Sequence, residues 1–498
     1  MSTDAVLGVD IGTSSSKGVL VSLDGRIIRT ATREHSVSRP APGQVEMDGD
    51  TWWQEFVEIA TGLTSGDETV LAVGVSGMGP CALLTEENGT PVRPAILYGV
   101  DTRATEQIGR LDRELGADEI FRRCGSALTS QAVGPKLAWV AENEPERWSR
   151  ARRLFMPASW LVWKLTGEYV LDLHSASQCT PLFDATALDW YDPWVTLIAP
   201  QLELPVLRWP GEIAGRTTSA IAGIAAGTPV ITGTIDAWSE AISVGAQNPG
   251  ELMLMYGTTM FLVLTLHSAI TEPSMWGTVG ALEGTRNLAG GMATSGAITA
   301  WLRDLTGADF AALTAEAASA GVGAGGILML PYFAGERTPI QDPDARGAIA
   351  GLTLSTTRGD LYRAALEATA FGVRHNLESM SRAGAVVQRV VAVGGGTQGD
   401  LWTRIVSDVT GLDQQIPTVT IGASFGAAFL AAGLVGSPDI SMWNPIDRTV
   451  SPDPATTAEY DDLYSLYREL YPAIATVSHR LAEIGRVRAA AERKEWAL

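Results

Sequence analysis

The chain has 498 residues, of which 46% are hydrophobic and 18% charged, and its formal net charge is −20. This length exceeds what one hydrophobic core supports, so we expect a globular protein of two or more domains. The negative charge argues against binding to nucleic acid or to an anionic membrane. No apolar stretch has the length of a membrane span, no secretory signal precedes the first strand, and three cysteines lack metal-ligand spacing, so we expect a cytoplasmic protein.

The first expected element is a β-hairpin at residues 6–21, "VLGVDIGTSSSKGVLV". Segments rich in valine and leucine on both sides of Gly12–Ser14 predict two buried strands joined by a tight polar turn. Backbone N–H groups in such a turn can bind an anion, with Lys17 nearby, and Asp10 could hold a cation beside it. The alternative is a structural turn in which Asp10 bonds its own backbone.

Strand-like and helix-like segments then alternate along the chain. Strands are expected at 69–77 and 227–236, and helices at 101–125 and 158–169, which predicts an α/β protein. Asp236 ends the second of these strands, a position where α/β sheets meet their ligands. A carboxylate there could accept the proton of a reacting hydroxyl, although Asp236 could also be only the N-cap of a helix.

The second half of the chain repeats the first motif. Residues 251–266, "ELMLMYGTTMFLVLTL", again give a strand, a Gly-Thr turn and a strand, which suggests two lobes of similar fold. We place the lobes at 1–246 and 247–498, with a cleft between them and an amphipathic helix at the C-terminal end. At 389–411 a strand, a glycine triplet and a helix follow one another; the triplet lets backbone approach a ligand closely, or is only a turn.

Together these motifs resemble the FGGY family of carbohydrate kinases, within the actin–hexokinase–heat-shock ATPase superfamily. "VDIGTSSSKGVLV" and "YGTTMFLV" are similar to the two phosphate motifs, and "GAIAGLTLSTTRGDLYRAALE" follows a family sequence pattern. "VGGGTQGDLWTRIVSDVTG" resembles the adenosine-side motif, and "FAGERTPIQDPDARG" is similar to a loop of the xylulokinase branch. The resemblance extends from residue 6 to about residue 472.

This resemblance implies two ribonuclease-H-like lobes of the actin/hexokinase type around a central cleft. It also implies that ATP and Mg²⁺ are used to phosphorylate a hydroxyl of a small sugar or polyol, with a pentulose as the leading expectation. Asp236 matches the general base and Asp10 the residue that holds the metal ion. The positions that match the ATP site are Gly12, Thr13, Ser14, Lys17, Gly257, Thr258, Thr259, Gly395, Gly396 and Thr397.

On the sugar side, Asp101 and Arg103 match an Asp-x-Arg segment of the family, although they could be only an exposed ion pair. Gly79 and Pro80 stand where xylulokinases usually have Met-His, so the sugar pocket is expected to lose a histidine contact and to gain room. This departure leaves a gluconate-type or polyol-type kinase open, since Arg103 could serve a carboxylate.

Two further expectations come from the resemblance. A member of another class within the same superfamily, an actin-like or chaperone-like ATPase without a sugar substrate, is the alternative function. Dimers are common in the family, so a homodimer is the expected assembly.

Overall fold

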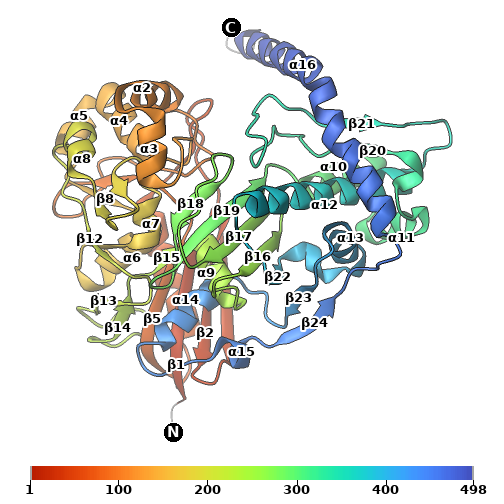
Figure 1. Cartoon of the computed structure of the whole chain (residues 1–498). Helices are drawn as coiled ribbons and strands as arrows, with labels where there is room; N and C mark the ends of the chain where they lie inside the picture. Colours follow the sequence, from red (N-terminus) through yellow and green to blue (C-terminus); the bar gives the residue numbers. More distant parts are fainter. Residues whose placement is uncertain (1–2, 496–498) are drawn as a thin grey trace. The chain divides into compact units, whose positions relative to one another are not determined.

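The computed structural model describes residues 3–495, which form two compact units (Figure 1). Each unit is assembled from three segments. Unit 1 comprises Met1–Pro249, Thr265–Leu288 and Thr418–Pro445, and unit 2 comprises Gly250–Leu264, Ala289–Pro417 and Ile446–Leu498. No pattern in the sequence indicated that two late segments return to the first unit. The α/β class is confirmed, since both units carry a sheet with helices.

The expected first hairpin opens the sheet of unit 1. Strand β1 (Asp4–Ile11) pairs antiparallel with β2 (Ser15–Ser22), which pairs antiparallel with β3 (Ile27–Glu34). On its other side β1 runs parallel to β5 (Thr69–Gly77), so that Asp10 lies opposite Ser76. The sheet therefore brings the end of the first strand next to the end of a strand about sixty-six residues later.

Different helices cover the two faces of this sheet. Helix α1 (Gly49–Leu63) lies over Gly18, where an added Cβ would come 2.2 Å from Ile59. Helix α14 (Ala423–Ala432), drawn in blue in Figure 1, lies over the red strands at the opposite face. A Cβ at Gly8 would come 2.0 Å from the Ser424 carbonyl oxygen. The small residues of α14 and the glycines of the strands thus allow the helix backbone to pack closely against the sheet.

The remaining elements of unit 1 form a helical subdomain and short strands. One expected helix, 101–125, is in fact two, because Gly116 has a φ of +83° that no α-helix continues through. These elements are β4 (Glu46–Met47), β6 (Leu83–Thr85), β7 (Ala95–Ile96), α2 (Thr105–Leu115), α3 (Ala117–Cys124), α4 (Val133–Asn143), α5 (Pro145–Arg150), β8 (Arg153–Phe155), α6 (Pro157–Thr166), β9 (Val170–Asp172), α7 (Leu173–Ser177), β10 (Phe183–Asp184), β11 (Asp189–Trp190), α8 (Asp192–Ile198), β12 (Val206–Arg208), β13 (Ile213–Arg216), β14 (Pro229–Ile231), β15 (Thr234–Ile235), α9 (Asp236–Ser243), β18 (Trp276–Val279) and α15 (Ile440–Trp443).

Unit 2 repeats the topology of the first sheet. Strand β16 (Glu251–Tyr256) forms an antiparallel hairpin with β17 (Met260–Leu266) and runs parallel to β22 (Arg389–Val393) on its other side. The same order, with a hairpin whose first strand pairs in parallel with a later strand, occurs in unit 1. The repeated Gly-Thr turn that the sequence showed therefore lies at an equivalent place in each sheet.

The other elements that contribute to unit 2 include the C-terminal helix, whose Tyr467 hydroxyl lies 2.9 Å from that of Tyr332. This contact shows that the first half of the expected C-terminal helix packs against unit 2. The elements are β19 (Arg286–Met292), α10 (Gly296–Thr306), α11 (Phe310–Ala320), η1 (Ala324–Gly326), β20 (Leu328–Leu330), β21 (Ala348–Ala350), α12 (Arg358–Arg382), η2 (Gly395–Gln398), α13 (Asp400–Thr410), β23 (Gln414–Pro417), β24 (Ile446–Val450) and α16 (Thr457–Glu495). None of the helices within residues 3–495 combines the length and the apolarity of a membrane-spanning segment.

Candidate active site

Three carboxylates gather at the end of β1 in unit 1. Asp10 ends this strand and accepts a hydrogen bond of 2.8 Å from the Ser76 hydroxyl on the adjacent β5. Asp236 is the first residue of α9, and Glu240 follows one turn later on the same helix. The negative charges of Asp236 and Glu240 both act on Asp10, whereas Lys17 is the cation that acts on Asp10 and on Glu240. Negative charge therefore exceeds positive charge in this group, in which Asp10 is buried, Asp236 and Glu240 are half-buried and Lys17 is exposed.

The surroundings of these carboxyl groups favour their protonated forms. Burial raises the pKa of Asp10, and the charges of Asp236 and Glu240 raise it further. Burial also raises the pKa of Asp236, although the backbone N–H of Ala237 donates to its carboxylate at 2.7 Å and lowers the pKa. Burial and the charge of Asp236 raise the pKa of Glu240 to about 7. A group with such shifts is typical of a site that handles protons or binds a cation.

The first polar turn presents unpaired backbone donors. The N–H of Gly12 donates to the Ser15 carbonyl at 3.1 Å and closes the turn. Within the part of the chain that the structure describes, the backbone N–H groups of Thr13 and Ser14 have no hydrogen-bond partner. A Cβ at Gly12 would come 2.8 Å from the Ser15 carbonyl oxygen, so this tight turn requires glycine. Two unpaired donors in one turn suit the binding of an anion.

The second turn, in unit 2, is also closed by its glycine N–H and is one residue shorter. The N–H of Gly257 donates to the Thr259 carbonyl at 3.1 Å. Among residues 3–495, no partner accepts from the N–H groups of Thr258 and Thr259. Both Gly-Thr turns therefore present two unpaired N–H groups, although their closing hydrogen bonds span three residues in the first turn and two in the second.

A cavity of about 460 Å³ lies beside the second turn within unit 2. Gly257 and Thr258 line one part of the cavity, and Gly395 and Gly396 of the glycine triplet line another. Trp402, Phe310 and Leu366 supply apolar walls. Thr397 is buried and turns back on the loop, with its hydroxyl donating to the Gly394 carbonyl at 2.8 Å. The volume of this cavity, its aromatic and apolar walls and the glycines that line it suit a flat, partly apolar ligand with phosphates at one end.

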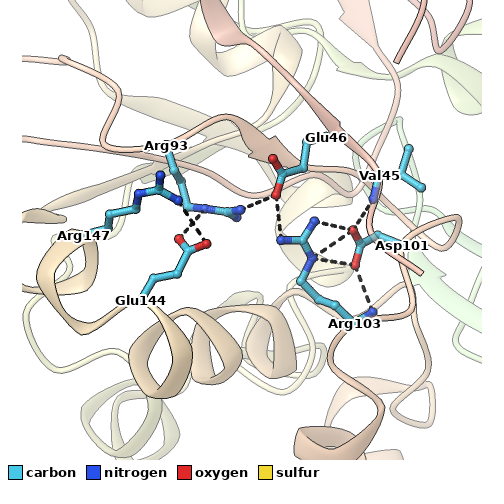
Figure 2. A network of polar contacts seen from close by, with 7 residues as sticks. All are labelled: Val45, Glu46, Arg93, Asp101, Arg103, Glu144 and Arg147. Carbon is cyan, nitrogen blue, oxygen red and sulfur yellow. Dashed lines mark hydrogen bonds and ion pairs between the residues drawn. The ribbon is translucent and has the colours of Figure 1, made fainter. Parts of the chain in front are cut away.

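Asp101 and Arg103 form an ion pair, but it is buried and not exposed. The guanidinium Nε lies 3.0 Å from each carboxylate oxygen of Asp101, and the backbone N–H of Val45 donates to the same carboxylate at 2.6 Å. Figure 2 shows that Arg103 also reaches Glu46, at 2.7 Å, which in turn contacts Arg93. The side chains of Arg103 and Asp101 are 1% and 0% exposed. This network fixes the segment that carries both residues.

We expect Arg103→Met to destabilise the protein by about 3–5 kcal/mol, because it leaves the buried Asp101 carboxylate without its cation, whereas Glu46 keeps Arg93. The matched control is Arg122→Met on α3, where the arginine is 67% exposed and pairs with Glu119. The control should cost less than about 1 kcal/mol. Urea unfolding followed by circular dichroism measures both changes. An Arg103→Met midpoint equal to that of the control would show that the network does not stabilise the fold.

Gly79 and Pro80 lie next to the residue that precedes Asp236. A Cβ at Gly79 would come 2.7 Å from the side chain of Ile235. The Ile235 side chain therefore occupies the place of a Cβ at Gly79, and the expectation of a roomier sugar pocket stays a prediction. Pro80 still lacks a backbone N–H, so the loss of one polar contact at this place remains a prediction.

Sequence reasoning missed Ser76 and Glu240. Glu240 stands four residues after Asp236, and this spacing places two side chains on one face of a helix. The sequence could therefore have predicted that Glu240 lies near Asp236. Ser76 becomes relevant only through the parallel pairing of β1 with β5, which no local pattern shows. Within residues 3–495 no set of three acidic, histidine or cysteine side chains is arranged to hold a metal ion.

Comparison with known proteins decides the family. The model for the N-terminal domain of the FGGY family of carbohydrate kinases matches residues 5–243, and the model for its C-terminal domain matches residues 252–434. The chain belongs to the FGGY family of carbohydrate kinases. It is thus a sugar phosphotransferase whose phosphate donor is ATP. Membership in this family also decides against the alternative of an actin-like or chaperone-like ATPase.

Relatives of this FGGY kinase act on more than one substrate. The xylulose kinase of Escherichia coli K12 is 29% identical, over 93% of this chain and 98% of that protein. The glycerol kinase of Nocardia farcinica is 32% identical, over 89% of this chain and 91% of that protein. The crystal structure of xylulose kinase from Rhodospirillum rubrum is 30% identical, covers 95% of this chain and all of that chain, and superposes with a TM-score of 0.90.

Proposed function

We propose that this kinase transfers the terminal phosphoryl group of ATP to a hydroxyl of a pentulose, with Asp236 as the general base. The observation that carries the proposal is the half-buried Asp236 at the head of α9, beside Asp10 and Glu240. Its raised pKa suits a base that takes a proton from a hydroxyl as that oxygen attacks phosphorus. Nearly full-length similarity to xylulose kinases supports the pentulose.

In this proposal each polar turn, taken within its own unit, offers backbone donors to a phosphate group. The unpaired N–H groups of Thr13 and Ser14 suit phosphate oxygens in unit 1, and those of Thr258 and Thr259 suit them in unit 2. Lys17 adds a positive charge near the first turn. The cavity of unit 2 would take the adenosine part.

The residues at the end of β1 fit a magnesium ion. Asp10 offers carboxylate oxygen, the ligand type that Mg²⁺ prefers, and the neighbouring carboxyl groups of Asp236 and Glu240 also favour a cation. Mg²⁺ in kinases takes one or two carboxylates together with water and phosphate oxygens, so a single Asp suffices. When bound, the ion would neutralise charge on the phosphates.

A polyol is the second candidate for the phosphate acceptor. The glycerol kinase of N. farcinica is as similar to this chain as the xylulose kinases are. Pro80, next to Gly79, offers no backbone donor, which suits an acceptor that needs one polar contact fewer.

The test is a coupled ADP-release assay with D-xylulose, L- and D-ribulose, xylitol, arabinitol, glycerol and gluconate. We expect the highest kcat/KM with a pentulose, and we expect D-xylulose to be weaker than a related pentulose because of Pro80. A clear preference for glycerol or gluconate would contradict the pentulose proposal. ADP release that does not depend on any acceptor would contradict sugar phosphorylation by this protein.

A further inference from the structure

His35 holds the carbonyl side of the first polar turn. Its backbone N–H donates to the Ser14 carbonyl at 3.0 Å, and its ring Nε2 lies 3.1 Å from the Gly12 carbonyl oxygen. The other ring nitrogen, Nδ1, lies 3.0 Å from Oε2 and 3.1 Å from Oε1 of Glu55 on α1. The hydroxyl of Ser16 donates to the same Glu55 at 2.5 Å. One histidine thus contacts two of the turn's carbonyl groups.

The chemistry of these contacts determines where the ring hydrogens lie. A carbonyl oxygen only accepts hydrogen bonds, so Nε2 must carry a hydrogen to make the Gly12 contact. Nδ1 faces a carboxyl group, and one hydrogen lies between them. The ring is enclosed, with 7% of the His35 side chain and 12% of the Glu55 side chain exposed. Glu55 therefore fixes the orientation of the imidazole, and the imidazole fixes the Gly12 carbonyl.

The contact between His35 and the Gly12 carbonyl determines the direction of the Thr13 N–H. A trans peptide holds its C=O and N–H on opposite sides, so a Gly12 carbonyl directed at His35 turns the Thr13 N–H away from His35. Glu55 lies on α1, which covers the face of the sheet toward which Gly18 points. Asp10 pairs with Lys17, the neighbour of Gly18 in β2, and so lies on the opposite face. The Thr13 N–H is directed to the face that carries Asp10.

The second turn is held in the same way by different donors. The Gly257 carbonyl accepts from the N–H of Gly296 at 3.0 Å. The Thr258 carbonyl accepts from Ser295 at 3.0 Å and from Ala297 at 3.1 Å. In unit 2 the start of α10 therefore does what the His35 side chain and backbone do in unit 1. In both turns the carbonyl group of the glycine accepts a hydrogen bond from the protein, whereas the N–H group of the following threonine has no partner among the described residues.

We propose that His35, oriented by Glu55, is a positioning residue for ATP. It ties down the Gly12 carbonyl so that the N–H group of Thr13, in the same peptide, faces a phosphate. The proposal rests on the proposed role of this turn in binding the phosphates of ATP. His35 touches neither the substrate nor the reacting atoms.

The experiment compares two isosteric variants. In His35→Gln the amide nitrogen takes the place of Nε2 and keeps the donor to Gly12, whereas in His35→Asn it takes the place of Nδ1 and loses that donor. We expect His35→Asn to raise the KM for MgATP about tenfold, the effect of losing one strong hydrogen bond, with the sugar KM unchanged. His35→Gln should keep most of the wild-type KM. His267→Asn, at an exposed histidine just after β17, is the control.

Three kinetic results would overturn the proposal. An unchanged KM for MgATP in His35→Asn overturns it, as does an equal loss in both variants or a rise in the sugar KM alone. Nitrogen NMR of wild-type His35, assigned with the variants, must show a hydrogen on Nε2; an unprotonated Nε2 also overturns it. If the wild type phosphorylates no acceptor, the proposed function fails separately, and calorimetric ADP binding then tests His35: weaker binding in His35→Asn supports the proposal and equal binding overturns it.

Discussion

Replacing Asp236 with asparagine is expected to lower kcat by about 10²–10⁴ while the KM for MgATP stays close to the wild-type value. Asparagine keeps the shape and can still accept from the Ala237 N–H, but it cannot take a proton from the acceptor hydroxyl. The loss should therefore be confined to the chemical step. Steady-state kinetics with the preferred acceptor measures it, with circular dichroism as the check on folding.

Glu240→Gln provides the comparison for this variant, because it removes a neighbouring negative charge and leaves the base in place. Its fall in kcat should be much smaller. The pH profile gives a second readout. Burial raises the pKa of Asp236, so the base becomes protonated at a higher pH than an exposed aspartate. The wild-type kcat should thus fall on acidification through that raised pKa, and Asp236→Asn should not show this fall. A kcat near the wild-type value in Asp236→Asn would remove Asp236 from the mechanism.

Local patterns predicted the parts of the site that lie at strand ends. The apolar segments on both sides of Gly12–Ser14 and of Gly257–Thr259 predicted buried strands with a polar turn between them, and both hairpins are present. The same holds for the strand, glycine triplet and helix at 389–411. In each case, the decisive information lies within about twenty consecutive residues. Hydrophobic patterning and turn residues carry that information.

Contacts between segments that lie far apart in the sequence could not be predicted from local patterns. The return of residues 418–445 to unit 1 depends on the fit of α14 against Gly8 and Gly74, a contact that only the folded backbone reveals. The burial of the Asp101–Arg103 pair depends on Val45 and Glu46, more than fifty residues earlier. The sequence of a short Asp-x-Arg segment does not indicate whether the segment is exposed or buried. His35 was likewise not singled out, because its partner Glu55 lies on another element.

Replacing Asp10 with asparagine should have two effects of opposite sign. We expect kcat to fall by about 10²–10³, because a preorganised charge that stabilises the transferred phosphoryl group is lost. The Mg²⁺ concentration needed for half-maximal rate should rise as well. In the absence of Mg²⁺, however, the variant should melt at a higher temperature than the wild type. Kinetics at varied Mg²⁺ and differential scanning calorimetry without nucleotide measure the two effects.

The gain in stability follows from the sign of the pKa shift. Burial and two neighbouring carboxylates raise the pKa of Asp10 in the folded chain, so the ionised form is less favourable there than in the unfolded chain. At neutral pH Asp10 is ionised in the unfolded chain, whereas the fold disfavours the ionised form, so this group destabilises the fold; the cost grows as pH rises from the unfolded pKa to the folded pKa. Asparagine removes it and can still accept from Ser76. Added Mg²⁺ should stabilise the wild type by offsetting the same charge, and should do so less in Asp10→Asn. A variant that melts lower than the wild type yet keeps its Mg²⁺ dependence would mean that Asp10 supports the fold and does not hold the ion.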